Sequence, residues 1–86
     1  MKRICYQVKR DGEDIKGCRW ATEMMAKAAL KIEIEVEYGY FKSDLDLEAD
    51  VSIRVASDGK SGTITLTGWD GKTTKTIEYT VSKIEF

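Results

Sequence analysis

The chain has 86 residues, 42% of them hydrophobic and 34% charged, with a net charge of −1. This composition is typical of one small globular domain covering residues 1–86 rather than of a disordered chain. Histidine is absent, which removes the commonest general base and metal ligand, and no apolar stretch reaches the roughly 18–20 residues that a membrane span needs.

The first residues predict a β-hairpin. Apolar residues alternate over residues 3–9, Asp11-Gly12 is typical of a two-residue type I′ turn, and residues 14–19 would return as the second strand. This register places Cys5 opposite Cys18. The apolar run after Met1-Lys2-Arg3 is too short for a signal peptide, so we expect a cytoplasmic protein with reduced cysteines.

A helix is predicted over residues 20–31, with Thr22 as its N-cap. The spacing of its small and apolar residues indicates one inward face, formed by Ala21, Met25, Ala28, Ala29 and Ile32.

Residues 32–41 allow two interpretations. The helix could continue to Tyr38 and end at Gly39, or Ile32–Phe41 could be a strand with Ile32, Ile34 and Val36 facing inward. The β-branched residues and the alternation of period two favour the strand.

The second half of the chain predicts further strands. Residues 45–55 alternate without interruption. Residues 63–69 and 72–81 form a hairpin around Asp70-Gly71, which is typical of a second type I′ turn, with Ile64 opposite Ile77. The predicted fold class is therefore α+β: a single, mainly antiparallel twisted sheet of order β-β-α-β-β-β-β with one helix packed on one face.

Charge is distributed unevenly along this fold. Residues 1–31 carry eight Lys or Arg and four acids, whereas residues 32–58 carry eight acids and two bases. If residues 45–55 are extended, four carboxylates form one outward row, and a strand over residues 32–41 would place three more beside it. This candidate partner-binding set consists of Asp44, Asp46, Glu48 and Asp50, with Glu33, Glu35 and Glu37.

Such a row indicates a surface for a basic partner. In the strand interpretation Glu35 opposes Asp50 and Glu37 opposes Glu48, and like charges across a strand pair are destabilising. An external basic surface would relieve that repulsion. An ordinary solvated sheet face is the alternative interpretation of the same acids.

Metal and catalytic sites are not predicted. The acidic run lacks the glycine and the final glutamate of an EF-hand loop, because Ala49 and Val55 stand there. Two cysteines without a Cys-x-x-Cys spacing make no zinc site, and no glycine-rich run leads into a helix as a phosphate cradle would. We therefore expect a non-catalytic protein without a cofactor.

Other parts of the chain could also contact a partner. Trp69, beside a tight turn, is a candidate interface anchor. The basic N-terminal third offers a second hypothesis, a small nucleic-acid-binding module. In this module Tyr6 and Trp20 would stack on bases. Its basic side chains would contact phosphates, namely Lys9, Lys16, Arg19, Lys27 and Lys31. A third hypothesis is a structural, self-associating domain that pairs through strand edges and tyrosines.

In size and charge layout the chain resembles the small phage-encoded inhibitors known as anti-CRISPR proteins. The shared traits are a compact α+β chain, no catalytic set, and acids clustered between Glu33 and Asp50. The resemblance implies a protein that occupies a nucleic-acid-binding surface of its target, in some cases by mimicking nucleic acid. It assigns no role to an individual residue.

Overall fold

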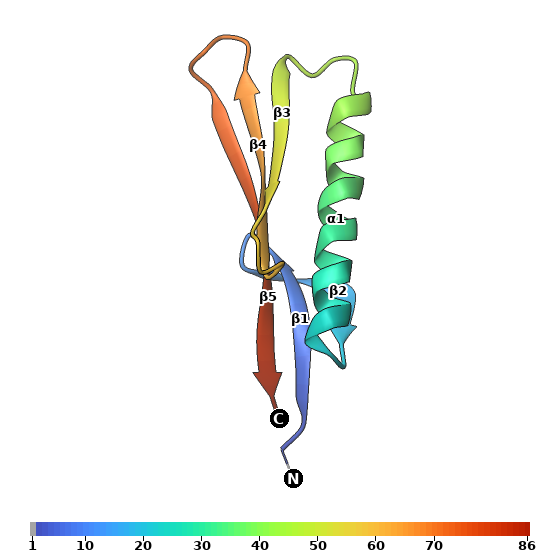
Figure 1. The fold of residues 1–86 in the computed structure, drawn as a ribbon. Coiled ribbons are helices and arrows are strands. Elements are labelled where there is room, and N and C mark those ends of the chain that lie inside the picture. Colours follow the sequence, from blue (N-terminus) through green and yellow to red (C-terminus); the bar gives the residue numbers. More distant parts are fainter. Residues whose placement is uncertain (1) are drawn as a thin grey trace.

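The computed structural model describes residues 2–86 as one five-stranded sheet with a single helix across one face (Figure 1). All strand pairs are antiparallel, and the strand order is β2-β1-β5-β4-β3. The α+β class with one helix on one face of the sheet is thus confirmed. The elements are β1 (Ile4–Arg10), β2 (Glu13–Trp20), α1 (Glu23–Ser43), β3 (Ala49–Val55), β4 (Ser61–Gly68) and β5 (Thr74–Glu85).

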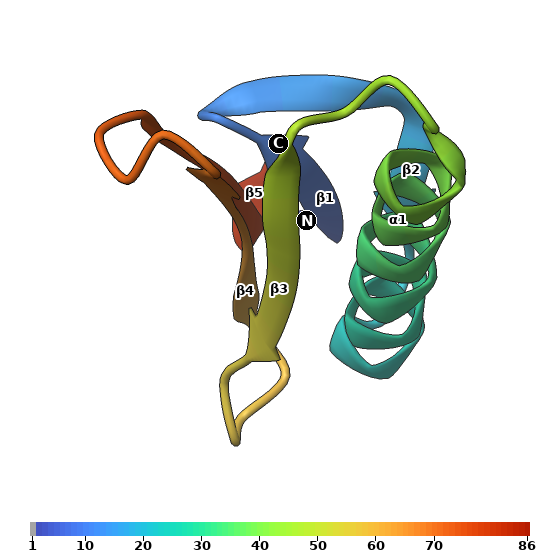
Figure 2. The ribbon, with the colours of Figure 1, turned by 90° about the horizontal axis from the view of Figure 1, so that it is seen from above.

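The core lies between α1 and the centre of the sheet, and Figure 2 shows these two layers from above. From the helix it contains Leu30 and Ile34, which are fully buried. From the sheet it contains residues of β1, β2, β4 and β5, namely Val8, Cys18, Ile64, Ile77 and Tyr79. The register of β4 with β5 is the predicted one, with Ile64 opposite Ile77.

Gly62 allows the helix to approach the sheet closely. A Cβ atom at this position would overlap the Cδ1 atom of Ile34 and would lie 3.0 Å from the carbonyl oxygen of Arg54. Both neighbours are fixed, one in the core and one in the β3–β4 ladder. The glycine is therefore needed for packing rather than for an unusual backbone conformation.

The expected strand Ile32–Phe41 is wrong, because these residues continue α1, which ends at Ser43 rather than at Gly39. The alternation of apolar and acidic residues fits a helix here because its apolar members lie on different helix faces. Ile34 is completely buried, whereas Ile32 and Val36 are 59% and 50% exposed. Burial of Ile34 against the sheet outweighs the modest strand preference of β-branched residues.

The inward face of the helix also differs from the prediction. Thr22 is the N-cap, as expected, and its hydroxyl oxygen accepts a hydrogen bond from the Met25 backbone N–H at 3.2 Å. The buried residues are Ala26, Ala29, Leu30 and Ile34, while Met25, Ala28 and Ile32 are exposed. The sheet therefore covers a stripe about a third of a turn away from the expected face.

The first hairpin has the predicted turn but not the predicted register. Asp11 and Gly12 both have positive φ, 52° and 82°, as a type I′ turn requires. Beyond Lys9 and Asp14 the pairing shifts, because β2 contains extra residues around Gly17, which has a φ of 82°. Tyr6 consequently pairs with Trp20, and the expected Cys5–Cys18 pair does not form.

Gln7 supports this irregular part of β2. It is 3% exposed, and its side-chain amide N–H groups donate to the carbonyl oxygens of Ile15 at 3.0 Å and Cys18 at 3.3 Å. The irregular strand leaves these carbonyls without a ladder partner, so the buried amide satisfies groups that would otherwise be costly to bury.

In the part of the chain that the structure describes, no helix combines the length and the apolar character needed to cross a membrane.

Replacing Gly62 with alanine tests the packing of α1 on the sheet. We expect Gly62→Ala to lower the free energy of unfolding by about 1–3 kcal/mol, because the added methyl group must displace Ile34 or the β3–β4 ladder. The matched control is Gly39→Ala in α1, where an added Cβ atom would meet nothing within 4 Å. The free energy of unfolding of this control should rise by about 0.5–1 kcal/mol, because alanine is favoured over glycine inside a helix. Urea unfolding of both variants at low protein concentration measures this, and equal stabilities would contradict the packing role of Gly62.

Candidate protein-binding surface

The predicted row of four acids is not an extended strand. The helix runs up to Ser43, Asp44 is its C-cap residue, and β3 begins only at Ala49. Between them the chain turns: the Oδ1 atom of Asp44 accepts a hydrogen bond from the Asp46 N–H at 3.0 Å, and its carbonyl oxygen accepts from the Leu47 N–H at 3.3 Å. Of the four acids, only Asp50 lies in a strand.

β3 begins only at Ala49 because its neighbour in the sheet, β4, ends there. β3 pairs with β4 from Ala49 opposite Gly68, and after Gly68 the chain enters the turn that leads to β5. One further bond forms, in which the Trp69 N–H donates to the Glu48 carbonyl oxygen at 3.0 Å. Residues before Glu48 have no strand beside them, so an extended backbone there would have no ladder partner.

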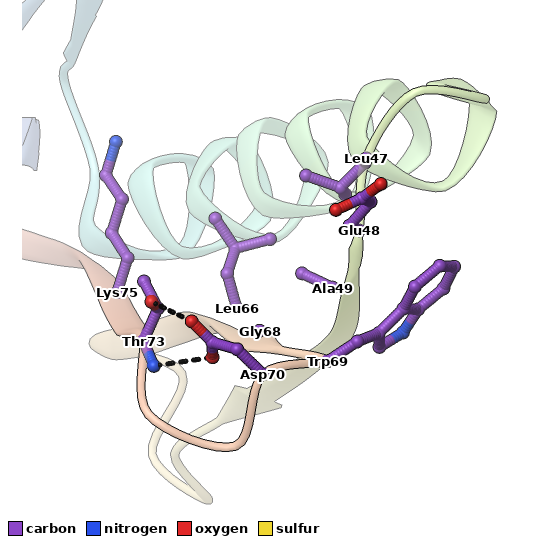
Figure 3. Close-up of a pocket in the computed structure, with 9 residues that line it drawn as sticks. All are labelled: Leu47, Glu48, Ala49, Leu66, Gly68, Trp69, Asp70, Thr73 and Lys75. Atoms are coloured by element: carbon purple, nitrogen blue, oxygen red, sulfur yellow. Dashed lines mark hydrogen bonds between the residues drawn. The ribbon is translucent and has the colours of Figure 1, made fainter.

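The structure nevertheless brings the acids and Trp69 to one end of the molecule. An open hollow of about 310 Å³ lies here, lined by Leu47, Ala49 and Leu66 together with Glu48 and Trp69. Figure 3 shows the side chains that line it. The Trp69 indole N–H donates to Asp50 Oδ1 at 3.4 Å, yet 68% of the residue stays exposed.

We call this end the acidic tip. It consists of the α1–β3 connection, the start of β3 and the β4–β5 turn. Its acids are Asp44, Asp46, Glu48, Asp50 and Asp70, and its exposed apolar residues include Leu45 and Trp69. Leu45 is 97% exposed, which is unusual for a leucine. Asp70 and Leu45 belong to the tip although the sequence pattern gave no reason to select them.

The β4–β5 turn that holds Trp69 is fixed by Asp70. One carboxylate oxygen accepts hydrogen bonds from the backbone N–H groups of Lys72 at 2.8 Å and Thr73 at 2.9 Å, and the other accepts from the Thr73 hydroxyl at 2.8 Å. These bonds, led by the one from the Thr73 backbone, hold the pKa of Asp70 below its ordinary value of 3.8. Gly71 adopts a positive φ of 74°, whereas Asp70 does not, so the turn is not the expected type I′.

The acidic tip keeps its negative charge. Among residues 2–86, none of its five carboxylates forms an ion pair. Three lysines are near in sequence, Lys42, Lys72 and Lys75, so five acids against three bases leave an excess of two negative charges. Exposed unpaired carboxylates around an exposed indole form a surface with both electrostatic and apolar attraction for a partner.

The three glutamates of α1 that were expected to join this surface, Glu33, Glu35 and Glu37, do not. Glu37 accepts a hydrogen bond from the guanidinium of Arg10 at 2.7 Å, which ties the helix to β1. Glu33 lies 3.5 Å from the Cys18 sulfur, and burial together with this carboxylate raises the pKa of the Cys18 thiol. Only Glu35 is exposed. The expected pairing of Glu35 and Glu37 with the acids of the following strand is therefore wrong.

The basic N-terminal third is partly neutralised by its own acids. Lys9 and Arg19 both lie within 4 Å of Asp14, at 3.7 and 3.9 Å, and Lys27 lies 3.1 Å from Glu23. The two aromatic residues expected to stack on bases, Tyr6 and Trp20, pack against the core instead. Of the five bases named for that surface, Lys16 and Lys31 form no ion pair within residues 2–86, so part of its positive charge remains.

Within residues 2–86, no group of three or more His, Cys, Asp or Glu side chains is arranged to hold a metal ion. Comparison with protein-family models, with curated proteins and with solved structures finds no match to this chain. Any functional assignment must therefore rest on the surface itself.

Lowering the pH tests how Asp70 holds the β4–β5 turn. Because its pKa is lowered by folding, the stabilisation is complete above the unfolded value and is lost as the pH falls through the folded value. We expect the Thr73 amide signal in NMR spectra to titrate with a midpoint below 3.8. In Asp70→Asn, which keeps an acceptor oxygen but cannot titrate, the transition should vanish. A wild-type midpoint at or above 3.8 would contradict the described bonds.

Proposed function

We propose that this protein is a non-catalytic, cytoplasmic inhibitor that binds a target protein through the acidic tip. The target surface would be basic, of the kind that normally binds nucleic acid, so that the tip and the nucleic acid compete for it. This is the function expected from the resemblance to small anti-CRISPR inhibitors.

The observation that carries the proposal is the convergence of unpaired carboxylates and an anchored, exposed indole. The indole N–H of Trp69 is held by Asp50, and the Trp69 backbone N–H is held by the Glu48 carbonyl oxygen, so little conformational entropy is lost when the side chain enters a partner pocket. The surrounding acids would steer a cationic surface towards it.

The carboxylates do not form an extended row. A straight row would imitate the regular phosphate spacing of nucleic acid, whereas the acidic tip presents its charges around a turn and beside apolar side chains. The support is therefore for charge-assisted protein binding with an apolar centre, rather than for a geometric copy of a nucleic-acid strand.

Neutralising part of the acidic tip tests the proposal. The variant Asp46→Asn/Glu48→Gln removes two exposed charges from the α1–β3 connection, and neither side chain accepts a hydrogen bond within residues 2–86. With an arginine-rich peptide as a probe, amide shifts in NMR spectra should concentrate in residues 44–50 and 69–73, and the variant should bind about tenfold more weakly. Added salt should weaken the wild-type interaction.

The matched control is Glu13→Gln/Glu78→Gln, which removes the same charge from two exposed positions in β2 and β5. It should bind the peptide as the wild type does. If both double variants lose equal affinity, the interaction depends on net charge alone and the acidic tip is not the binding site.

The inhibitor role needs a target as well as a surface. Capture from nuclease-treated bacterial lysate should retain a nucleic-acid-binding protein, and the purified pair should be separated by that protein's own DNA or RNA. The Asp46→Asn/Glu48→Gln variant should capture less of it than the control. Capture that disappears after nuclease treatment would indicate bridging by nucleic acid and would contradict the proposal.

A further inference from the structure

A second exposed surface lies on α1, away from the acidic tip. It is a continuous apolar stripe formed by Met25, Ala28, Ile32, Val36 and Tyr40. Four of these residues are large and exposed: Met25 (49%), Ile32 (59%), Val36 (50%) and Tyr40 (71%). Residues three or four positions apart lie on one side of a helix, so together they form one apolar surface over the length of α1.

The sheet cannot cover this stripe because it ends on that side. Glu33 of α1 contacts Cys18 in β2, whereas Ile34, the next residue, lies over Gly62 in β4. The stripe therefore faces the β2 side, and β2 is the edge strand. Such a contiguous apolar surface on a small protein is typical of an interaction site.

We propose that α1 pairs in antiparallel orientation with α1 of a second copy of this chain, through this stripe. The proposal is independent of the acidic tip and of the inhibitor function. It assigns one occupant to the stripe, and two features of the helix support that choice.

The first feature is the charge beside the stripe. Lys31 and Glu35 lie on its solvent-facing margin, and neither forms an ion pair within residues 2–86. A twofold axis between two identical surfaces makes every contact reciprocal. Placing Lys31 opposite Glu35 of the second copy also places Glu35 opposite Lys31, so a single register forms two ion pairs with no like charges opposed.

The same register aligns the apolar residues. It brings Ile32 and Val36 of both copies around the axis, and it places Met25 within one residue of Tyr40 on the other helix. Ala28 then lies within one residue of Gly39 on the second copy. Two small residues facing each other let helix backbones approach closely.

Gly39 is the second feature. Glycine inside a helix costs about 0.5–1 kcal/mol relative to alanine, and its φ here is not positive. A Cβ atom at Gly39 would meet nothing within 4 Å, so the chain's own packing does not require it. Close approach of another helix gives this glycine a purpose.

Charge reversal tests the pairing, with the full chain and with its mass in solution as the readout. The wild type should approach twice the 9.7 kDa of one chain as its concentration rises in sedimentation equilibrium. Lys31→Glu and Glu35→Lys should each raise the dissociation constant about tenfold, because each opposes like charges at both reciprocal contacts. An equimolar mixture of the two variants should regain the affinity of the wild type, since both ion pairs re-form between unlike chains.

The control Lys16→Glu makes the same charge change in β2 and should associate as the wild type does. Gly39→Leu separates association from folding: it should raise the stability of the monomer yet weaken the dimer. Thermal unfolding at low concentration confirms that each variant is folded. A wild type that stays monomeric, or single variants that associate normally, would overturn the proposal, as would a mixture no tighter than its components.

Discussion

The packing of α1 on the sheet, with Ile34 over Gly62, is the contact on which the rest of the structure depends. It brings the helix close to β4 and fixes which of its sides is buried. The sheet covers only a narrow stripe centred on Leu30 and Ile34, because a helix on a small sheet can bury about one side of its surface. The same packing leaves Ile32 and Val36, on another side of the helix, exposed.

This contact also explains why the acids of α1 and those after it have different surroundings. Glu33 and Glu37 are one turn apart beside the buried stripe, where Cys18 and Arg10 face them. Like charges at this spacing repel, and the guanidinium of Arg10 offsets the repulsion for Glu37. Asp44, Asp46 and Glu48 lie after the helix and before the paired part of β3. They stay exposed because the sheet provides no strand beside them.

Local chemistry predicted the first turn and the register of the second hairpin, whereas the turn at Asp70-Gly71 is not the expected type I′. Asp11-Gly12 has both positive φ values that its sequence indicates, and Ile64 pairs with Ile77 because alternation and the turn position together fix the register. The Cys5–Cys18 pairing failed because Gly17 allows extra residues in β2, and the buried amide of Gln7 stabilises them. No local sequence pattern predicts such a bulge, because its stability depends on a side chain from the neighbouring strand.

The interpretation of residues 32–41 failed for a different reason. A six-residue alternation fits a strand, and it also fits a helix that has one apolar side against a sheet and another facing solvent. The sequence does contain the apolar face predicted for the helix, but the fold buries only Ala29 of that face and leaves Met25, Ala28 and Ile32 exposed. The candidate site was predicted in part for a similar reason. Asp44, Asp46, Glu48, Asp50 and Trp69 do meet, but they meet through the end of α1 and a turn, which alternation alone does not indicate.

Pairing through α1 would determine where the two acidic tips of a dimer lie. The acidic tip follows the C-terminal end of α1, and a 21-residue helix is about 31 Å long. In an antiparallel helix pair the two C-terminal ends lie at opposite ends of the contact, so the two acidic tips would be separated by at least that length. One dimer could then bind two basic surfaces without the tips repelling each other, because the separation exceeds the Debye length of about 8 Å at physiological salt. Where a target carries two such surfaces, or assembles in copies, the second contact becomes intramolecular and strengthens binding without any new interaction. Self-association through α1 would therefore increase the effect of a tip whose own charge excess is small.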